Sequence, residues 1–391
     1  MRVLLSFPYA LGRVGVGRTA QRQAEGLAAL GHEVFVAAPL VAAGAGLDPR
    51  VTVHETLRLA GRRIPARLLR ATGARAAIHD RRAARWLRRL HRDAPLDVLH
   101  AWPLSGIRTM RAARERGTTV VREAPNTHTG HAYDVVEQEA ARLGLGIPAG
   151  NSHRRDPAHL AAEQREWELA DAILAPSDAV AASFLDRGFA PDRVVRHRYG
   201  CDPGPVPPRD DPDRPLRAVF LGAVEPRKGV HHALRSWADS AASEDGTLTI
   251  AGRWMDGYRE RLADLRGARG VVEAGFVEDP SALLADADVL LLPSVEEGSA
   301  IVTYEAQAAG CIPLVSRQAG AFATDGVHAL LHEAGDTATL TAHLDLLHRD
   351  PALRARMRAA CLEDRDRLGW DAAATALADA YAVAGRRAVR A

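Results

Sequence analysis

Two glutamates separated by seven residues, Glu297 and Glu305, have the types and spacing that suggest chemistry. They lie in the stretch LLLPSVEEGSAIVTYEAQAAG, where we expect a strand ending at Pro293 and a helix capped by Ser299 and ending at Gly310. Because Glu305 would lie about one and a half helical turns beyond Glu297, both side chains can face one ligand. Paired carboxylates accept hydrogen bonds from neighbouring hydroxyls, as a ribose or hexose offers. The alternative is one exposed glutamate and one that favours the helix dipole.

The start of the same helix and a basic turn earlier in the chain could both bind phosphate. The first amide groups of a helix, here those of Ala300, Ile301 and Val302, lack acceptors within the helix and attract anions. Arg227 and Lys228 lie in the turn GAVEPRKGV, directly after an apolar strand, where they could neutralise a diphosphate. Lys228 is the only lysine of the chain. A solvated pair of surface cations is the alternative.

A glycine-rich turn, GRVGVG, follows the first apolar strand. Its order, with Gly12, Gly15 and Gly17, differs from that of a dinucleotide-binding loop. The next strand ends in Val-Ala-Ala-Pro, and Asp48 comes too late to bind a ribose, so we expect no nicotinamide cofactor. Gly15 and Gly17 would still let the backbone approach a ligand between two domains.

Histidines supply further candidates. His128, in VREAPNTHTGHAYD, follows an apolar strand and could contact a sugar hydroxyl or orient an acceptor. His128 and His131 also form H-x-x-H, but no third ligand stands at a recognisable spacing, so we expect no metal site there. His231 and His232 are expected on a helix face, with a structural role.

The elements that would position these residues repeat one plan of strand, glycine turn, helix and strand. The plan occurs from Arg2 to Pro39, with a helix expected over Gln21–Leu30, and again from Leu216 onward. Continuous apolar strands alternating with helices predict parallel sheets covered on both faces. Further strands are expected at residues 97–101, 118–122, 271–276, 289–292 and 312–316. The fold class is therefore α/β, with two doubly wound domains in tandem.

The proline-rich segment 202–215 divides the chain because it can hold neither a helix nor a central strand. We expect a first domain over residues 1–201 and a second over 216–368. A last helical segment, 369–391, follows the second domain.

Composition excludes several classes of protein. With 391 residues, 47% hydrophobic and 26% charged, the chain is neither one small module nor disordered. A formal charge of +2 gives no reason to expect a nucleic-acid partner. No stretch is apolar enough to span a membrane, and the amino-terminal residues predict a first strand, not a signal peptide. Three widely spaced cysteines indicate buried thiols in a reducing cytoplasm.

One segment is strongly basic. From Arg58 to Arg92 there are twelve arginines and one acidic residue, Asp80. Contact with an anionic membrane at its inner face, or with an acidic acceptor, is one interpretation. A solvated helical face in an arginine-rich protein is the interpretation that we favour.

Taken together, these motifs resemble the GT-B-fold glycosyltransferases of family 4 along nearly the whole chain. The resemblance is densest after Glu163, in E-x-x-E-W-E-L-A-D-A-I-L-A-P-S, in VFLGAVEPRKGV and in the E-x7-E signature of Glu297 and Glu305. It implies two Rossmann-like domains that face each other across a cleft, and a last helix that crosses back to the first domain. It also implies a retaining hexosyltransferase that moves a sugar from a nucleoside-diphosphate sugar to a hydroxyl of a glycan, lipid-linked or natural-product acceptor, with no cofactor and no metal.

The resemblance also assigns roles by position. Arg227 and Lys228 would hold the diphosphate, Glu305 the ribose and Glu297 the hydroxyls of the donor sugar. His128 would be the active-site histidine near the transferred sugar. Gly15 and Gly17 would belong to the loop that approaches the phosphates and the acceptor.

The sequence departs from the family pattern at three places. Ala223 stands where many members have arginine, Gly298 is followed by Ser-Ala, and the acidic position after Gly320 is lost. The change after Gly298 alters the wall beside the sugar, so the donor's identity is left open. Two other functions fit the same fold: a nucleotide-sugar epimerase, hydrolase or phosphorylase, and a non-catalytic nucleotide-sugar-binding subunit.

Overall fold

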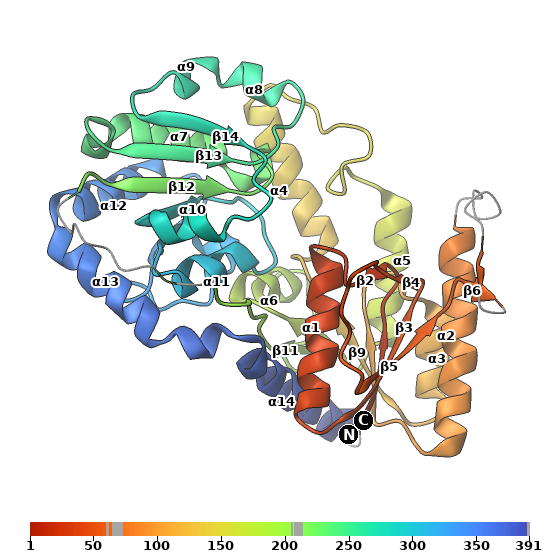
Figure 1. Cartoon of the computed structure of the whole chain (residues 1–391). Helices are drawn as coiled ribbons and strands as arrows, with labels where there is room; N and C mark the ends of the chain where they lie inside the picture. The colour runs from red at the N-terminus through yellow and green to blue at the C-terminus, as the bar shows by residue number, and fades with distance from the viewer. Residues whose placement is uncertain (60–61, 65–72, 205, 207–213, 389–391) are drawn as a thin grey trace.

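The computed structural model describes residues 1–59, 62–64, 73–204, 206 and 214–388. Within these ranges the chain forms two large parallel sheets, each with helices on its faces, in the early and late parts of the sequence (Figure 1). The expected α/β architecture of two doubly wound domains is therefore confirmed.

The first domain is built on a sheet of seven described strands, all parallel. From edge to edge they are β11 (Val194–Arg196), β10 (Ala172–Ala175), β9 (Thr119–Glu123), β8 (Val98–Ala101), β1 (Arg2–Ser6), β3 (Glu33–Ala38) and β5 (Val51–Glu55). The chain starts at β1, runs outward to β5 and returns to β8, so the order reverses between β1 and β8. Such a reversal opens a crevice at the carboxyl ends of the strands.

Helices cover both faces of this sheet. They include α1 (Val16–Ala29), α2 (Ala74–Asp93), α3 (Ile107–Arg114), α5 (Pro157–Leu169) and α6 (Asp178–Leu185), whereas α4 (Thr129–Arg142) contacts the short 3-10 helix Pro226–Lys228 of the second domain. The prediction of a helix starting at Gln21 was wrong: α1 begins at Val16, because Gly15, with a φ of 87°, ends the glycine turn directly before it. Short strand pairs, β2 (Ala10–Leu11) with β4 (Leu40–Val41) and β6 (Arg58–Leu59) with β7 (Arg62–Arg63), flank the sheet.

The second domain has a parallel sheet of six described strands. In spatial order they are β14 (Val271–Gly275), β13 (Thr247–Ala251), β12 (Arg217–Leu221), β15 (Val289–Leu292), β16 (Ile312–Ser316) and β17 (Leu330–His332). The order reverses between β12 and β15. The loops that carry the residues predicted to bind phosphate and sugar therefore leave the sheet at its switch point, where open α/β sheets bind ligands.

Its helices are α7 (Val230–Asp239), α8 (Tyr258–Arg261), α9 (Ala263–Arg266), α10 (Ser281–Asp286), α11 (Ile301–Ala308), α12 (Thr337–Arg349) and α13 (Pro351–Glu363). The last helix, α14 (Trp370–Ala388), lies beside α1 (Figure 1). Leu377 and Tyr381 of α14 are buried in the core of the first domain, and the Tyr381 hydroxyl lies 2.7 Å from Nδ1 of His100.

Parts of two predicted segments lie outside the described residues, namely 60–61 and 65–72 of the basic segment and most of the expected linker 202–215. Of the basic segment, α2 packs its buried side, which includes His79 and Leu87, against the first domain and leaves arginines such as Arg81 and Arg88 exposed. Contact of these arginines with a membrane stays a prediction. None of the helices described is long and apolar enough to cross a membrane.

Candidate active site between the two domains

A buried cluster of opposite charges occupies the switch point of the second sheet. Arg227 and Lys228 end a short 3-10 helix (Pro226–Lys228) between β12 and α7, and Glu297 lies in the loop after β15. The Glu297 carboxylate forms ion pairs with Arg227 and with Lys228. The backbone N–H of Val295 donates to the Arg227 carbonyl at 2.8 Å, which joins the two loops. The sequence predicts all three residues at one crevice. It predicts that Arg227 and Lys228 bind the diphosphate and that Glu297 binds the sugar, not that they pair with one another.

The charges of this cluster balance one another. Burial alone would lower the pKa of Arg227, but Glu297, Glu296 and Glu225 outweigh it and raise this pKa. Burial lowers the pKa of Lys228 in spite of its pairing with Glu297. Burial would raise the pKa of Glu297, yet Arg227 and Lys228 hold it below its ordinary value. Glu297 is therefore ionised, and Lys228 is the cation that burial leaves less firmly protonated.

Arg227 has more carboxylate partners than Lys228. Its Nε lies 2.9 Å from the Glu225 carboxylate, and its Nη1 lies 3.4 Å from the Glu296 carboxylate. Nη1 also donates to the backbone carbonyl of Glu296 at 3.1 Å. These contacts fix the shape of the acidic loop. Lys228 therefore is the better candidate for a charge that exchanges its partner when a ligand arrives.

Glu305 lies inside α11, the helix that follows the acidic loop. No hydrogen bond or ion pair to its carboxylate is seen among the described residues. Burial, and then the charge of Asp202, raise the pKa of Glu305. A half-buried carboxylate without a partner is available to accept hydrogen bonds from a ligand's hydroxyls.

The amino terminus of α11 differs from the expectation in two respects. The prediction that Ser299 caps the helix was wrong: Ala300 is the N-cap residue, and the Ser299 hydroxyl lies 2.9 Å from that of Tyr304 and donates to the Gly320 carbonyl. The N–H of Ala300 is also not free, because it donates to the Ala319 carbonyl at 3.1 Å. Ile301 and Val302, in the first turn, keep their place as candidate phosphate donors.

The two glycines of the first domain have different roles. Gly15 has open space where a side chain would begin and a positive φ that favours glycine. Gly17 lies in the first turn of α1, where an added Cβ would approach the Ala10 carbonyl oxygen to 2.4 Å. Gly17 is therefore needed for packing, and Gly15 is the one that leaves room for a ligand.

The hydrogen bond and the ring contacts of the His128 side chain are with residues of the first domain. His128 caps α4 by accepting the N–H of Gly130, and its ring packs against Trp167, Phe184 and Phe189. Burial and the charge of Arg187 lower the pKa of His128 to about 4, so the ring is neutral at physiological pH. An active-site role for His128 stays a prediction.

Residues that the sequence analysis missed join the two domains beside the charge cluster. The Thr127 hydroxyl donates to Glu296 at 2.7 Å, and His153 lies 3.4 Å from the same carboxylate. The Ser177 hydroxyl donates to the Gly298 carbonyl. The only sequence signal was the doublet Glu296-Glu297, which does not say which carboxylate faces the other domain.

Two cavities adjoin Thr127. One of about 320 Å³ lies in the first domain and is lined by Arg122, Thr129, Tyr133 and Glu163 among others. The other, of about 830 Å³, lies between α6 and the loop after β16. None of the predicted site residues lines the larger cavity, although the neighbouring Glu296 does.

The two facing Rossmann-like domains, with a charged crevice at the switch point of the second, define the GT-B class of glycosyltransferase. The family comparisons agree. Residues 14–200 match the "Glycosyl transferase 4-like domain" and residues 215–350 match "Glycosyl transferases group 1". These two matches span most of the chain. The chain therefore belongs to the GT-B glycosyltransferases of the family 4 type, as the sequence resemblance implied.

Several known proteins are similar. D-inositol 3-phosphate glycosyltransferase 2 of Catenulispora acidiphila is 29% identical over 328 residues, which are 75% of this chain and 72% of that protein. Sucrose-phosphate synthase from Thermosynechococcus elongatus matches in structure with a TM-score of 0.68 and 17% identity, over 98% of both chains. HepE of Anabaena matches with a TM-score of 0.67 and 15% identity, over 97% of this chain and 99% of the other.

Proposed function

We propose that this glycosyltransferase moves a hexose-type sugar from a nucleoside-diphosphate sugar to a hydroxyl of its acceptor, with retention of the anomeric configuration. The observation that carries the proposal is the buried group of Arg227, Lys228 and Glu297 at the switch point of the second sheet. A diphosphate and a sugar are the two halves of a ligand that needs both cations and a carboxylate.

Binding of the donor would exchange the partners within this group. Phosphate oxygens compete with Glu297 for Lys228, and the carboxylate that they displace accepts hydrogen bonds from the sugar's hydroxyls. Glu305, which has no partner among the described residues, would accept hydrogen bonds from the ribose. Arg227 stays with Glu225 and Glu296 and supplies a fixed positive charge beside the phosphates.

Catalysis would rest on stabilisation of the leaving group. The bond between the anomeric carbon and the diphosphate oxygen breaks, a new bond forms to the acceptor's oxygen, and the acceptor's proton is released. Negative charge grows on the nucleoside diphosphate, where Lys228, Arg227 and the first amides of α11 would stabilise it. Loss of one such group costs about 2–4 kcal/mol of transition-state stabilisation in comparable sites.

The solved neighbours support a choice of donor for the first experiments. HepE of Anabaena was crystallised in complex with UDP and with UDP-glucose. UDP-glucose is therefore our first candidate donor, ahead of GDP, ADP and TDP sugars.

For the acceptor, the cavity of about 320 Å³ in the first domain is the candidate site. The Glu163 carboxylate and the Thr129 and Tyr133 side chains among its lining suit a compact molecule with several hydroxyls. The relative from Catenulispora acidiphila is named for an inositol phosphate acceptor, which supports cyclic polyols and their phosphates as the first acceptors to screen.

The test is a donor screen with and without such acceptors, in which nucleoside diphosphate and glycosylated product are both measured. We expect nucleotide release that depends on an acceptor, and a product with the donor's anomeric configuration by NMR. Equal donor consumption without acceptor would favour a hydrolase or epimerase. Donor binding without turnover, under every acceptor tried, would favour a binding subunit.

A further inference from the structure

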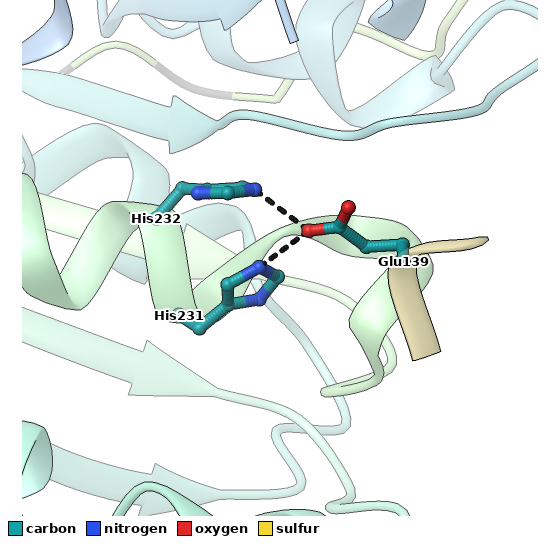
Figure 2. A group of neighbouring side chains, drawn as sticks. All are labelled: Glu139, His231 and His232. Carbon is teal, nitrogen blue, oxygen red and sulfur yellow. Dashed lines mark hydrogen bonds and ion pairs between the residues drawn. The ribbon is translucent and has the colours of Figure 1, made fainter. Parts of the chain in front are cut away.

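Two adjacent histidines of the second domain and a glutamate of the first converge at one point. Figure 2 shows the imidazoles of His231 and His232, from the first turn of α7, directed at the carboxylate of Glu139, from α4. Nε2 of His231 lies 2.7 Å and Nε2 of His232 lies 2.9 Å from the same oxygen, Oε1. We propose that these three residues form a site for a divalent transition cation, of which Zn²⁺ is the type, that ties the two domains together.

The convergence of the rings is the first argument. Neighbouring residues on a helix normally point about 100° apart, so adjacent side chains do not face one target. Here the ring centroids of His231 and His232 are 3.9 Å apart, and one ligand atom from each of the three residues lies within 4.8 Å of the others. Zn–N and Zn–O bonds of about 2.0–2.1 Å in tetrahedral geometry require ligand separations of about 3.3 Å, so the distance from each histidine to Oε1 of Glu139 would widen by about 0.5 Å.

The types of the three side chains are the second argument. Burial lowers the pKa of His231, which keeps that imidazole neutral. Burial would raise the pKa of Glu139, but hydrogen bonds from His231 and His232 outweigh it and hold the carboxylate ionised. Two imidazoles and one carboxylate are a set of ligands that binds Zn²⁺ and related first-row cations, with a fourth position for water.

Neighbouring groups hold the ligands in place, as is usual around metals. The Tyr258 hydroxyl lies 2.6 Å from Nδ1 of His231 and accepts the backbone N–H of the same residue. When Nε2 of His231 binds a cation, the ring's proton moves to Nδ1 and can be donated to Tyr258. Arg142 lies 3.0 Å from the other oxygen of Glu139, which leaves Oε1 to the site.

The site is accessible but sheltered. The side chains of Glu139, His231 and His232 are 4%, 10% and 15% exposed, so a small cation can enter on the His232 side. A bound cation would link α4, which begins two residues after Thr127, to α7, which begins two residues after Lys228. It would therefore stabilise the pairing of the domains beside the candidate active site, without contacting the substrates.

The test is Zn²⁺ binding to untagged, chelator-stripped protein, measured by competition with a chromophoric chelator. We expect one equivalent per chain for the wild type, and binding at least tenfold weaker in His232→Gln and in Glu139→Gln. His348→Gln is the matched control, because His348 lies on α12 beside Asp245 and outside the cluster, and it should bind like wild type. Co²⁺ should give the visible absorption of a tetrahedral site in the wild type, and Zn²⁺ should raise the melting temperature of wild type and not of His232→Gln.

Either of two results would overturn the proposal. One is the absence of stoichiometric Zn²⁺ binding in the wild type, which would leave the cluster as a hydrogen-bonded contact only, even if His232→Gln melts at a lower temperature. The other is a loss of Zn²⁺ affinity in His348→Gln that is as large as the loss in His232→Gln. Both results leave the donor and acceptor assignments untouched, because nucleotide binding is measured separately.

Discussion

The hydroxyl of Thr127 donates to the carboxylate of Glu296 at 2.7 Å, across the boundary between the two domains. The backbone N–H of Thr127 donates to the same oxygen at 3.2 Å. Since Glu296 also contacts Arg227, this single carboxylate links the loop after β9 to the basic turn that is proposed to hold the diphosphate. The domain contact and the candidate active site are therefore one hydrogen-bonded unit.

Gly298→Ala should disrupt this unit. A Cβ at Gly298 would lie 1.7 Å from the carbonyl oxygen of Pro125, which belongs to the first domain, so the backbones that meet at this domain contact must move apart. We expect lower turnover and a larger radius of gyration by small-angle X-ray scattering. Gly146→Ala is the matched control, because nothing lies within 4 Å of a Cβ there. Equal radii and turnover in both variants would contradict the closed contact at Gly298.

Glu305→Gln should weaken the binding of a nucleoside diphosphate and leave the binding of pyrophosphate unchanged. Hydrogen bonds between the carboxylate and the ribose hydroxyls are worth about 1.5–3 kcal/mol, which corresponds to about a tenfold to hundredfold loss of affinity. Calorimetric titration with both ligands separates the two effects. A parallel loss for pyrophosphate would mean that Glu305 supports the fold of the site and not the ribose.

The three cysteines should be unreactive in the native protein. Cys201, Cys311 and Cys361 are buried, and burial raises the pKa of Cys201 and of Cys361 to about 12. Since the thiolate is the reactive form, an aromatic disulfide reagent at pH 8 should label none of them until urea is added, and then all three. Rapid labelling without denaturant would show that the packing around them opens.

Acidification should destabilise the first domain through His79. Its ring is buried between Thr56 and Ser6, and burial, with the charge of His54, lowers the pKa of His79 to about 4. The unfolded chain, with a histidine pKa of about 6.5, binds the proton more tightly, so stability present above pH 6.5 is lost as the pH falls toward 4.

The loss due to one such histidine is at most about 1.4 kcal/mol per pH unit. Urea unfolding at pH 7 and pH 5 measures it, and His79→Gln should show a smaller difference between the two pH values than the wild type. The same difference in both proteins would exclude His79 as a source of acid sensitivity.

The strands and the crevice were predictable for clear reasons. The predicted strands at residues 289–292 and 312–316 coincide with β15 and β16, because a strand buried on both faces is mostly apolar along its whole length. Arg227 and Lys228 follow a strand directly, so they must lie at the edge of the parallel sheet where the carboxyl ends of its strands meet. Their crevice therefore followed from local sequence.

Contacts between the domains were not predictable in this way. The bond from Thr127 to Glu296, and the convergence of Glu139 on His231 and His232, join segments roughly ninety to one hundred and seventy residues apart in the chain. No local pattern encodes such a contact, since each residue alone is compatible with an exposed surface. The adjacent histidines were the one available signal, and their expected place on a helix face predicted only a structural role for them.

The most direct test of the central claim is a titration of UDP and UDP-glucose, alongside GDP, ADP and TDP, against wild type, Lys228→Ala and Arg235→Ala. Arg235 is an exposed cation of α7 outside the site, so it controls for a general loss of positive charge. We predict saturable binding of one nucleotide, weakened at least tenfold by Lys228→Ala and unchanged by Arg235→Ala. Equal affinity in all three proteins would contradict the claim that the Arg227, Lys228 and Glu297 cluster is the donor site.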